Sequence, residues 1–319
     1  MTELTLLADA GGTFTRFALA DGATIGPVRI VESGHYRSFI DAAREFLKDA
    51  GGKPSHAAIA AAGPLSHGEI TLTNGPRWRI APHDVATGLQ LSSVRVVNDF
   101  AALAAAAPHL DPAGLTDIAP GTADPAGAIA VIGPGTGLGV ALLAPLGEGR
   151  HRVLPGEGGH AGLSPTNDRE SAILSRLVAR FGHVKAEHVL SGLGLEILWE
   201  TLAELDGVAT TPKPSAGEIA ERAEAGTCAI ARETVAIFTG WLGGFAGDIA
   251  LIAGASGGVY LAGGILPRWG TLFDTALFHR RFTAKGAHQA LMEAIPVRLV
   301  TDPQVTFRGL LALGAGEAA

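Results

Sequence analysis

Two segments of this chain share one plan, and that plan constrains the fold more than any other feature of the sequence. Residues 6–20 read LLADAGGTFTRFALA, and residues 130–144 read AVIGPGTGLGVALLA. In both, an apolar run typical of a strand leads into a turn with glycine and threonine, and a second apolar run follows. The similarity indicates two hairpins and suggests that one α/β unit is duplicated in the chain.

A strand that delivers polar residues to a helix lies at residues 94–108, VRVVNDFAALAAAAP. Its apolar, β-branched run is typical of a buried parallel strand, and it stops at Asn98-Asp99, where an alanine-rich segment begins. Ligands of open α/β sheets bind beyond the carboxyl ends of such strands, so we expect Asn98 and Asp99 to lie in or beside the ligand-binding site. The structural alternative is that Asp99 only caps a helix over residues 100–107.

The remaining pattern alternates strands with helices and therefore predicts an α/β protein. Asn167 with Glu170, and Ser215 with Glu218, have the spacing of capping boxes. The other expected elements are a helix at 36–50, a strand at 57–62, a long helix at 228–253, a strand at 259–262, an amphipathic helix at 269–284, a strand at 297–300 and a closing helix at 307–314.

The chain is long enough for two domains, since 319 residues exceed the usual size of a single hydrophobic core. Residues 108–127 are rich in proline, glycine and aspartate and indicate a boundary near residue 110. We therefore expect one α/β domain over residues 1–110 and a larger one over residues 111–300.

Charge and cysteine content exclude several classes of protein. The net charge is −7, with 24 Lys and Arg against 31 Asp and Glu and no basic block, which argues against a nucleic-acid partner. A lone cysteine, Cys228, cannot form a disulfide framework or a multi-cysteine metal site and indicates a reducing, cytoplasmic location.

No targeting or membrane segment is expected. The N-terminus leads directly into a strand, which argues against a signal peptide. Glycines interrupt the two long uncharged stretches, 125–147 and 249–267, so neither is expected to span a membrane. The sequence does not determine the oligomeric state; a homodimer is the assembly expected if the chain self-associates.

The two glycine-threonine turns are candidate phosphate sites, because a tight turn after a strand presents several backbone N–H groups to an anion. An acidic residue beside the first turn, Asp9, is compatible with phosphate only if Mg²⁺ or its water shell lies between them. The alternatives are plain hairpin turns and an Asp9 side chain that bonds the backbone of its own turn. The turn residues are Gly11, Gly12 and Thr13 in the first and Gly135, Thr136 and Gly137 in the second.

A second group of polar residues suits a sugar. Glu157, His160 and Glu187, together with Asn98 and Asp99, offer the acceptors and donors that many hydroxyls require. Zinc is a weaker alternative, because only Glu157 and His160 are closely spaced. For Glu187 the structural alternative is a solvated helix start.

At these motifs the chain resembles the bacterial glucokinase family, which belongs to the sugar-kinase, heat-shock-protein and actin superfamily. The resemblance runs from end to end of the chain. The similar blocks are DAGGT (9–13), TNGPRW (73–78), NDF (98–100), GTGLGVALL (135–143), LPGEGGH (154–160), AEHVLSGLGL (186–195) and GVYLAGGILPR (258–268).

The resemblance implies a two-domain actin/hexokinase-like fold, a duplicated ribonuclease H-like unit with a cleft between the domains, in which a C-terminal helix within 301–319 completes the small domain. It implies that Asp99 is the catalytic base and that Asn98, Glu157, His160 and Glu187 hold the sugar. It also implies that the two turns hold the phosphates of ATP and that Gly263 and Gly264 flank the nucleoside.

Two positions depart from the family's pattern. Phe14 stands where the family usually has asparagine after GGT, and Leu193 replaces the proline of SGPGL. Phe14 bears on nucleotide affinity and not on the type of reaction. The zinc-binding cysteine cluster of the related repressor and kinase group cannot form in a chain with one cysteine.

The expected reaction is transfer of the γ-phosphoryl group of ATP to the 6-hydroxyl of glucose, as in glycolysis, with Mg²⁺ neutralising phosphate charge. A kinase for another hexose and a non-catalytic sugar sensor are the alternatives, and a sensor would need no phosphate turns. We expect the helix N-terminus to keep the pKa of Asp99 low. We also expect sugar to close the cleft and to strengthen ATP binding.

Overall fold

The structure is a computed structural model that describes residues 3–148, 150–209 and 212–314. The chain divides into two compact units. Unit 1 comprises residues 1–111 and 302–319, and unit 2 comprises residues 112–301. The C-terminal helix α11 (Val305–Leu313) is part of unit 1, whereas residues 315–319 of the expected C-terminal segment lie outside the described residues.

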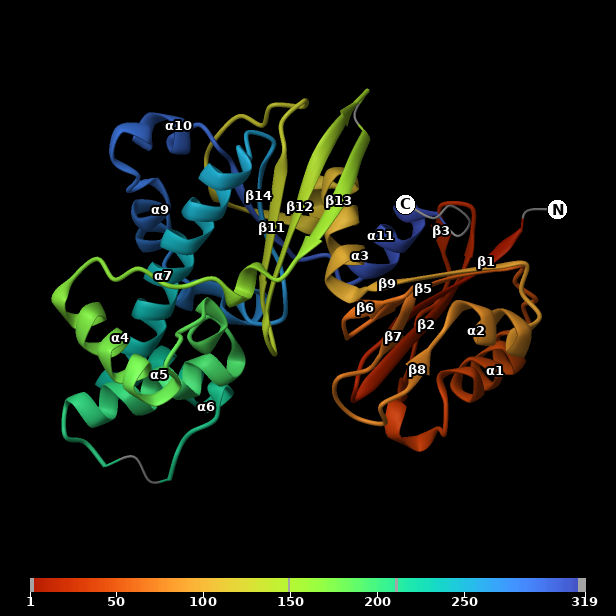
Figure 1. Cartoon of the computed structure of the whole chain (residues 1–319), viewed down its shortest axis with the longest axis horizontal. Helices are drawn as coiled ribbons and strands as arrows, with labels where there is room; N and C mark the ends of the chain where they lie inside the picture. Colours follow the sequence, from red (N-terminus) through yellow and green to blue (C-terminus); the bar gives the residue numbers. More distant parts are fainter. Residues whose placement is uncertain (1–2, 149, 210–211, 315–319) are drawn as a thin grey trace. The chain divides into compact units, whose positions relative to one another are not determined.

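Unit 1 is built on one mixed sheet with the strand order β3-β2-β1-β5-β9, and β4 pairs with β2 (Figure 1). The β1–β2 pair is the antiparallel hairpin expected from the first glycine turn, and β5 and β9 extend the sheet parallel to β1. The strands are β1 (Leu4–Ala10), β2 (Phe14–Asp21), β3 (Thr24–Ile25), β4 (Arg29–Glu32), β5 (His56–Ala61) and β9 (Ser93–Asn98). A small sheet of β6 (Leu65–Ser66), β7 (Glu69–Thr71) and β8 (Arg79–Ile80) accompanies it.

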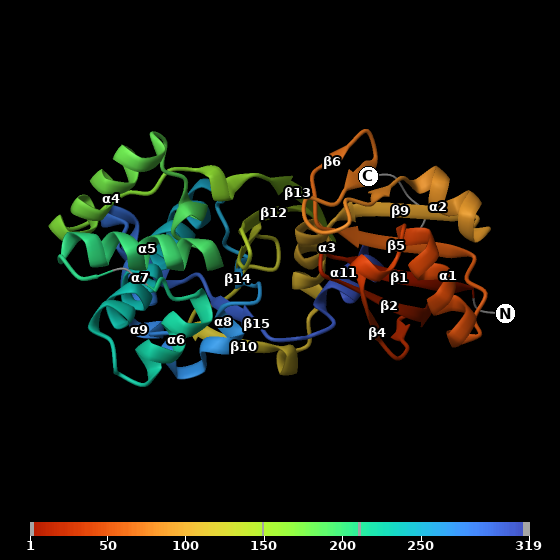
Figure 2. The same ribbon diagram turned by 90° about the horizontal axis from the view of Figure 1, so that it is seen from below.

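Helices cover both faces of this sheet because successive strand residues point to opposite sides. Leu6 packs in the cluster of α1 (Phe39–Ala50) and α2 (Pro82–Leu89), and Leu7 packs in the cluster of α3 (Asp99–Ala106) and α11. In both views α11 lies along α3, although about 200 residues separate them in sequence (Figures 1 and 2). Both faces are buried, which explains why β1 and β5 are almost uniformly apolar.

Unit 2 repeats this topology. Its sheet has the order β10-β15-β14-β11-β12-β13, in which β11 and β12 form an antiparallel hairpin and β14 and β15 continue parallel to β11. The duplicated α/β architecture predicted from the two glycine turns is therefore confirmed. The strands are β10 (Leu115–Ala119), β11 (Ile129–Pro134), β12 (Leu138–Gly147), β13 (Arg150–Gly156), β14 (Gly258–Leu261) and β15 (Val297–Val300).

The central helix of unit 2 is α7 (Ala229–Ala253). By length and composition it is the one helix within the described residues that could cross a membrane, but 61% of its most apolar window is buried inside the protein. Gly243 and Gly247 give α9 (Thr275–Thr283) room, since a Cβ at either would lie within about 2.5 Å of a carbonyl oxygen of α9. The other helices of unit 2 are α4 (Asp168–Phe181), α5 (Gly192–Leu205), α6 (Ala216–Glu224), α8 (Leu266–Trp269) and α10 (Gln289–Glu293).

Two local predictions were wrong. The helix expected at 269–284 does not form as one element: Trp269 ends α8, residues 270–272 form a 3₁₀ turn and α9 begins at Thr275, because Gly270 adopts φ +49°. Within residues 108–127, β10 follows the boundary expected near residue 110. Asn167 does cap α4, but the Glu170 side chain bonds Thr166 and Arg281 and so does not complete a capping box; the box at Ser215 and Glu218 is confirmed.

Candidate active site

The carboxyl ends of three parallel strands converge at one edge of the unit 1 sheet. Ala10 of β1 pairs with Ala61 of β5, and Ala61 pairs with Asn98 of β9. Beyond this edge lie the first glycine turn and the start of α3, where Asp99 is the first helical residue. The topology thus gathers on one edge polar residues that the chain places almost 90 positions apart.

Asn98, not Asp99, is the N-cap of α3. Its Oδ1 accepts hydrogen bonds from the N–H groups of Phe100 (2.9 Å) and Ala101 (3.2 Å), and its Nδ2 donates to the carbonyl of Gly63 (3.0 Å). The expected capping role therefore falls one residue earlier. Asn98 keeps a second amide hydrogen with no partner in the described part of the chain, and its role as a sugar ligand stays a prediction.

The carboxylate of Asp99 is more basic than expected. Burial, and secondarily the negative charge of Asp9, raise its pKa to about 6, although its Oδ1 accepts a 2.9 Å hydrogen bond from Phe100 N–H. The expectation of a low pKa was wrong, because desolvation and a like charge outweigh the helix N-terminus. A carboxylate with such a pKa is suited to general base chemistry near neutral pH.

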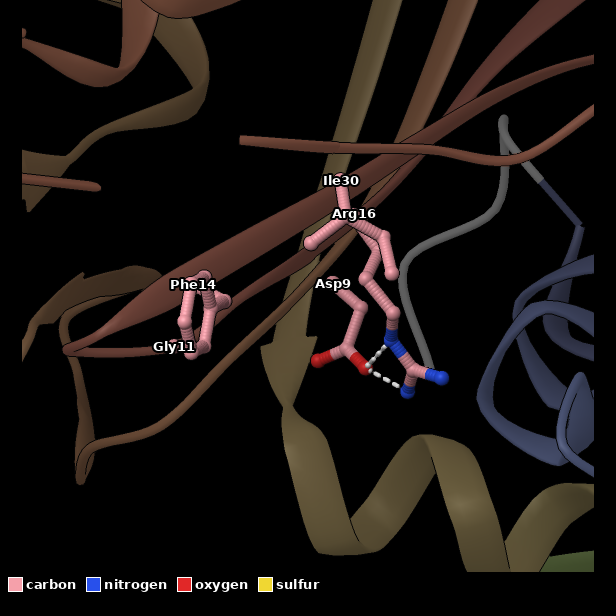
Figure 3. A pocket seen from close by; sticks show the side chains of 5 residues that line it. All are labelled: Asp9, Gly11, Phe14, Arg16 and Ile30. Carbon is pink, nitrogen blue, oxygen red and sulfur yellow. Dashed lines mark hydrogen bonds and ion pairs between the residues drawn. The ribbon is translucent and has the colours of Figure 1, made fainter. Parts of the chain in front are cut away.

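Asp9 pairs with Arg16, the residue directly opposite it in the β1–β2 hairpin (Figure 3). Both Nε (3.1 Å) and NH2 of Arg16 donate to Oδ2 of Asp9, and NH1 donates to the carbonyl of Pro303 at 3.0 Å. Arg16 was not among the residues predicted from the sequence, although opposite charges at facing positions of a hairpin indicate such a pair.

The Oδ1 atom of Asp9 has no hydrogen-bond partner among the described residues, and it is the atom that fits Mg²⁺. No group of three or more His, Cys, Asp or Glu side chains able to hold a metal occurs in the described residues. Mg²⁺ in phosphoryl-transfer enzymes commonly uses one or two carboxylates together with waters and substrate phosphates, so a single carboxylate oxygen fits that chemistry.

Hydrogen bonds stabilise the first glycine turn. Gly11 N–H donates to the carbonyl of Phe14 (3.0 Å). Ser33 Oγ donates to the carbonyl of Gly11, and Ser33 N–H donates to the carbonyl of Thr13. A Cβ on Gly12 would lie 2.6 Å from the carbonyl oxygen of Asn74, so glycine is required there for packing. The N–H groups of Gly12 and Thr13 have no partner within the described residues and could bind phosphate oxygens.

A cavity of about 590 Å³ lies beside this turn (Figure 3). Phe14, 52% exposed, and Ile30 make its apolar part, while Asp9 and Arg16 supply the charged part. Phe14 therefore lines the region next to the turn and is not buried in the core.

The second glycine turn repeats this arrangement in unit 2. Gly135 N–H donates to the carbonyl of Gly137 (2.8 Å), and the Gly135 carbonyl accepts from Gly192 N–H at the start of α5 (2.8 Å). Gly263 follows β14 with φ +86° and packs on the carbonyl of Pro134, so only glycine fits there. The N–H groups of Thr136 and Gly137 have no partner in the part of the chain that the structure describes.

The polar residues expected in unit 2 gather beside this turn. Glu187 lies on a short 3₁₀ helix, η5 (Ala186–His188), and its Oε2 accepts from Leu138 N–H at 2.9 Å. A Cβ on Gly137 would lie 2.5 Å from that oxygen, so glycine lets the carboxylate approach the turn. His160 Nε2 lies 3.8 Å from Oε1 of Glu187.

Lys185 is a further member of this group that the sequence analysis did not identify. Its Nζ donates to Oε1 of Glu187 (2.7 Å) and contacts Nε2 of His160 (3.2 Å). Burial raises the pKa of Glu187, but the Lys185 hydrogen bond, the Leu138 N–H and the Lys185 charge together lower it below its usual value. Glu187 is thus an ionised, half-buried acceptor. It lies in the first turn of η5, as the alternative expected, but it is not fully solvated there.

Glu157 follows β13 directly, and its exposed carboxylate has no hydrogen-bond partner among the described residues. His160 ends the 3₁₀ turn η4 (Gly158–His160), which Glu157 begins. Unit 2 therefore presents two carboxylates and an imidazole from neighbouring segments.

The chain is similar to known proteins over nearly its whole length. The family model described as Glucokinase matches residues 6–316. A protein named Glucokinase from Paramagnetospirillum magneticum is 41% identical over 98% of this chain and 98% of its own length.

Solved structures show the same similarity. The crystal structure of a glucokinase from an Antarctic psychrotroph has a TM-score of 0.89 and 35% identity, covering 98% of this chain and 99% of that one. A glucokinase from Balamuthia mandrillaris, solved in complex with glucose, has a TM-score of 0.81 and 24% identity over 99% of this chain and 94% of its own. The second similarity, at this level of identity, shows the fold alone.

Proposed function

Since this chain belongs to the glucokinase family, we propose that Asp99 is the base of its phosphoryl transfer and that the neighbouring polar groups bind its two substrates. The reaction is ATP-dependent phosphorylation of glucose at the 6-hydroxyl to give glucose 6-phosphate. Such transfers depend mainly on positioning and on electrostatic stabilisation, because the loose transition state needs little covalent assistance from the protein.

The observation that carries the proposal is the raised pKa of Asp99 at the carboxyl end of β9. A carboxylate whose pKa is about 6 is largely ionised at neutral pH, yet it is a better proton acceptor than an ordinary aspartate. Asp99 would accept the proton of the 6-hydroxyl as that oxygen attacks the γ-phosphorus, and the bond to the β-phosphate oxygen breaks as ADP leaves.

In unit 2, Glu157, His160 and Glu187 would bind the sugar. In unit 1, Asn98 is the sugar ligand that we propose. Ionised carboxylates accept strong hydrogen bonds from hydroxyl groups, and an imidazole N–H or an amide N–H donates to a hydroxyl oxygen. These contacts would orient the hexose, and the same set would serve a closely related hexose, which keeps that alternative open.

The nucleotide would be held by backbone groups. The N–H groups of Gly12, Thr13, Thr136 and Gly137 suit phosphate oxygens, and Gly263 and Gly264 would flank the nucleoside. Mg²⁺, held near Oδ1 of Asp9 directly or through water, would neutralise phosphate charge when it is bound.

The direct test is ADP release coupled to an indicator reaction over a panel of hexoses. We expect glucose to give the highest kcat/KM. Equal or greater kcat/KM for another hexose would reassign the substrate, and sugar binding without ADP release for any hexose would favour the sensor.

The pH dependence of kcat/KM tests the proposed base. Because Asp99 must be ionised to accept a proton, log(kcat/KM) for glucose should be constant above pH about 7, bend near pH 6 and approach a slope of one below pH about 5. Rates in a constant-ionic-strength buffer from pH 4.5 to 8 would show the inflection. An inflection near pH 4 would show that the base of the reaction does not have a raised pKa.

The sugar-binding carboxylates are tested by Glu157→Gln and Glu187→Gln. Each variant loses charge-assisted hydrogen bonds of about 1.5–3 kcal/mol, so KM for glucose should rise roughly 10- to 150-fold. Glu196→Gln is the matched control, because the one ion pair of Glu196 among the described residues is a 3.8 Å contact with Lys213, outside the proposed site. An unchanged KM in both site variants would exclude these residues from the sugar site.

A further inference from the structure

We propose that Lys185 is a positioning residue of the hexose site, whose ammonium group fixes the Glu187 carboxylate and sets which nitrogen of His160 faces the sugar. The inference rests on the proposed role of Glu187 and His160 in binding glucose. It concerns a residue whose ammonium contacts both partners, Glu187 Oε1 at 2.7 Å and His160 Nε2 at 3.2 Å.

The backbone holds Lys185 in a fixed place between the two partners. Lys185 forms an antiparallel bridge with Gly162, and Ala186 N–H donates to the carbonyl of Ala161 at 2.7 Å. The segment that carries Glu187 is therefore bonded directly to the segment that carries His160. The Lys185 side chain is only 22% exposed, so its ammonium is not a freely moving surface group.

The ammonium determines the tautomer of His160. A lysine ammonium has three donors and no acceptor, so the 3.2 Å contact requires His160 Nε2 to offer its lone pair. The ring proton then lies on Nδ1, which has no hydrogen-bond partner in the described residues. His160 would thus donate to a sugar oxygen through Nδ1 and would not accept from one.

The ammonium also orients Glu187 without saturating it. Leu138 N–H occupies one lone pair of Oε2, and Lys185 occupies one of Oε1. A carboxylate has about four lone-pair positions, so two remain for hydroxyl groups of the hexose. The third ammonium hydrogen of Lys185 has no acceptor among the described residues and is available to a sugar oxygen as well.

The test compares Lys185→Met, Lys185→Arg and the control Lys213→Met. Methionine is one atom shorter than lysine and removes the charge and all donors, so KM for glucose should rise about tenfold while kcat changes less than about threefold. Arginine keeps a cation and should restore KM to within about threefold of the wild type. Lys213 pairs with Glu196 and Glu200 at 3.7–3.8 Å, and its loss should leave both constants unchanged.

The pH profile of KM separates positioning from general packing. The groups that face Glu187 are Lys185, His160 and Leu138 N–H. His188 is close enough to interact with the charges of Lys185 and Glu187, and His183 contacts the carbonyl of His160. Without Lys185 the pKa of Glu187 rises, so KM of Lys185→Met should increase between pH 7 and pH 5 more steeply than in the wild type. Parallel profiles for the two proteins would overturn the proposal.

The outcomes distinguish this inference from the proposed site. If Glu187→Gln raises KM and Lys185→Met does not, Lys185 has no positioning role and the sugar site stands. If Lys185→Met lowers KM, the ammonium competes with the sugar and the proposal is wrong. If Glu187→Gln has no effect, the sugar site itself is misplaced.

Discussion

The Asp99→Asn variant should retain glucose affinity within about tenfold and lose turnover by roughly 10²–10⁴, the usual contribution of a positioned general base. The amide preserves the size of the side chain but cannot accept the proton of the 6-hydroxyl. Single-turnover rates and calorimetric glucose titrations would separate the two effects. Asp111→Asn, at an exposed position of the same unit, is the matched control. Turnover at the wild-type rate would show that Asp99 has only a structural role at the start of α3.

The same variant should be more stable than the wild type, and only at high pH. Because the pKa of Asp99 in the folded protein is about 6 against an ordinary value of 3.8, its ionisation costs the folded state about 3 kcal/mol. The stability linked to this group is complete below the ordinary pKa and is lost as pH rises through 6. Urea unfolding at pH 4 should therefore give similar midpoints, and unfolding at pH 8 should favour Asp99→Asn. Equal urea midpoints for the variant and the wild type at both pH 4 and pH 8 would contradict the raised pKa of Asp99.

The Arg281→Met variant should lose about 3–5 kcal/mol of stability, because it leaves a buried carboxylate without its counter-charge. Glu170 is 3% exposed and accepts from NH1 (2.6 Å) and NH2 (3.1 Å) of Arg281, and from Thr166 N–H (2.8 Å). This pair joins α4 to α9. Burial opposes ionisation, but Arg281 and Thr166 together lower the pKa of Glu170, so the stabilisation is present above the ordinary glutamate pKa and is lost as pH falls through the lowered value.

A double variant makes this prediction specific. Adding Glu170→Gln to Arg281→Met removes the stranded charge and should recover part of the lost stability, measured by urea unfolding. Arg222→Met removes an exposed ion pair in which Arg222 NH2 lies 3.7 Å from Oε1 of Glu218. This variant should lose no more than about 0.5 kcal/mol of stability. A loss in Arg281→Met as small as in this control would show that the Glu170 pair contributes little.

Much of the fold and part of the site could be predicted from the sequence, because both depend on local patterns. The apolar runs and glycine turns predicted two similar hairpins, and the structure has the same strand order in both units. The end of an apolar strand at Asn98-Asp99 predicted polar groups at the carboxyl edge of a sheet, where Asn98 and Asp99 lie. Strand period and turn chemistry extend over only a few residues, so a linear sequence shows them.

Other properties depend on residues that only the tertiary structure brings together. The sequence gives no sign that Asp9 is close enough to raise the pKa of Asp99, or that Glu170 bonds Arg281 instead of closing a capping box. Likewise, Lys185 looks like an ordinary polar residue until the bridge with Gly162 brings His160 beside it. The pattern along the chain thus determined which helices and strands form. Desolvation and charge interactions depend on distances between residues far apart in sequence. The tertiary structure therefore decided the acidity, the burial and the hydrogen bonds of each functional group.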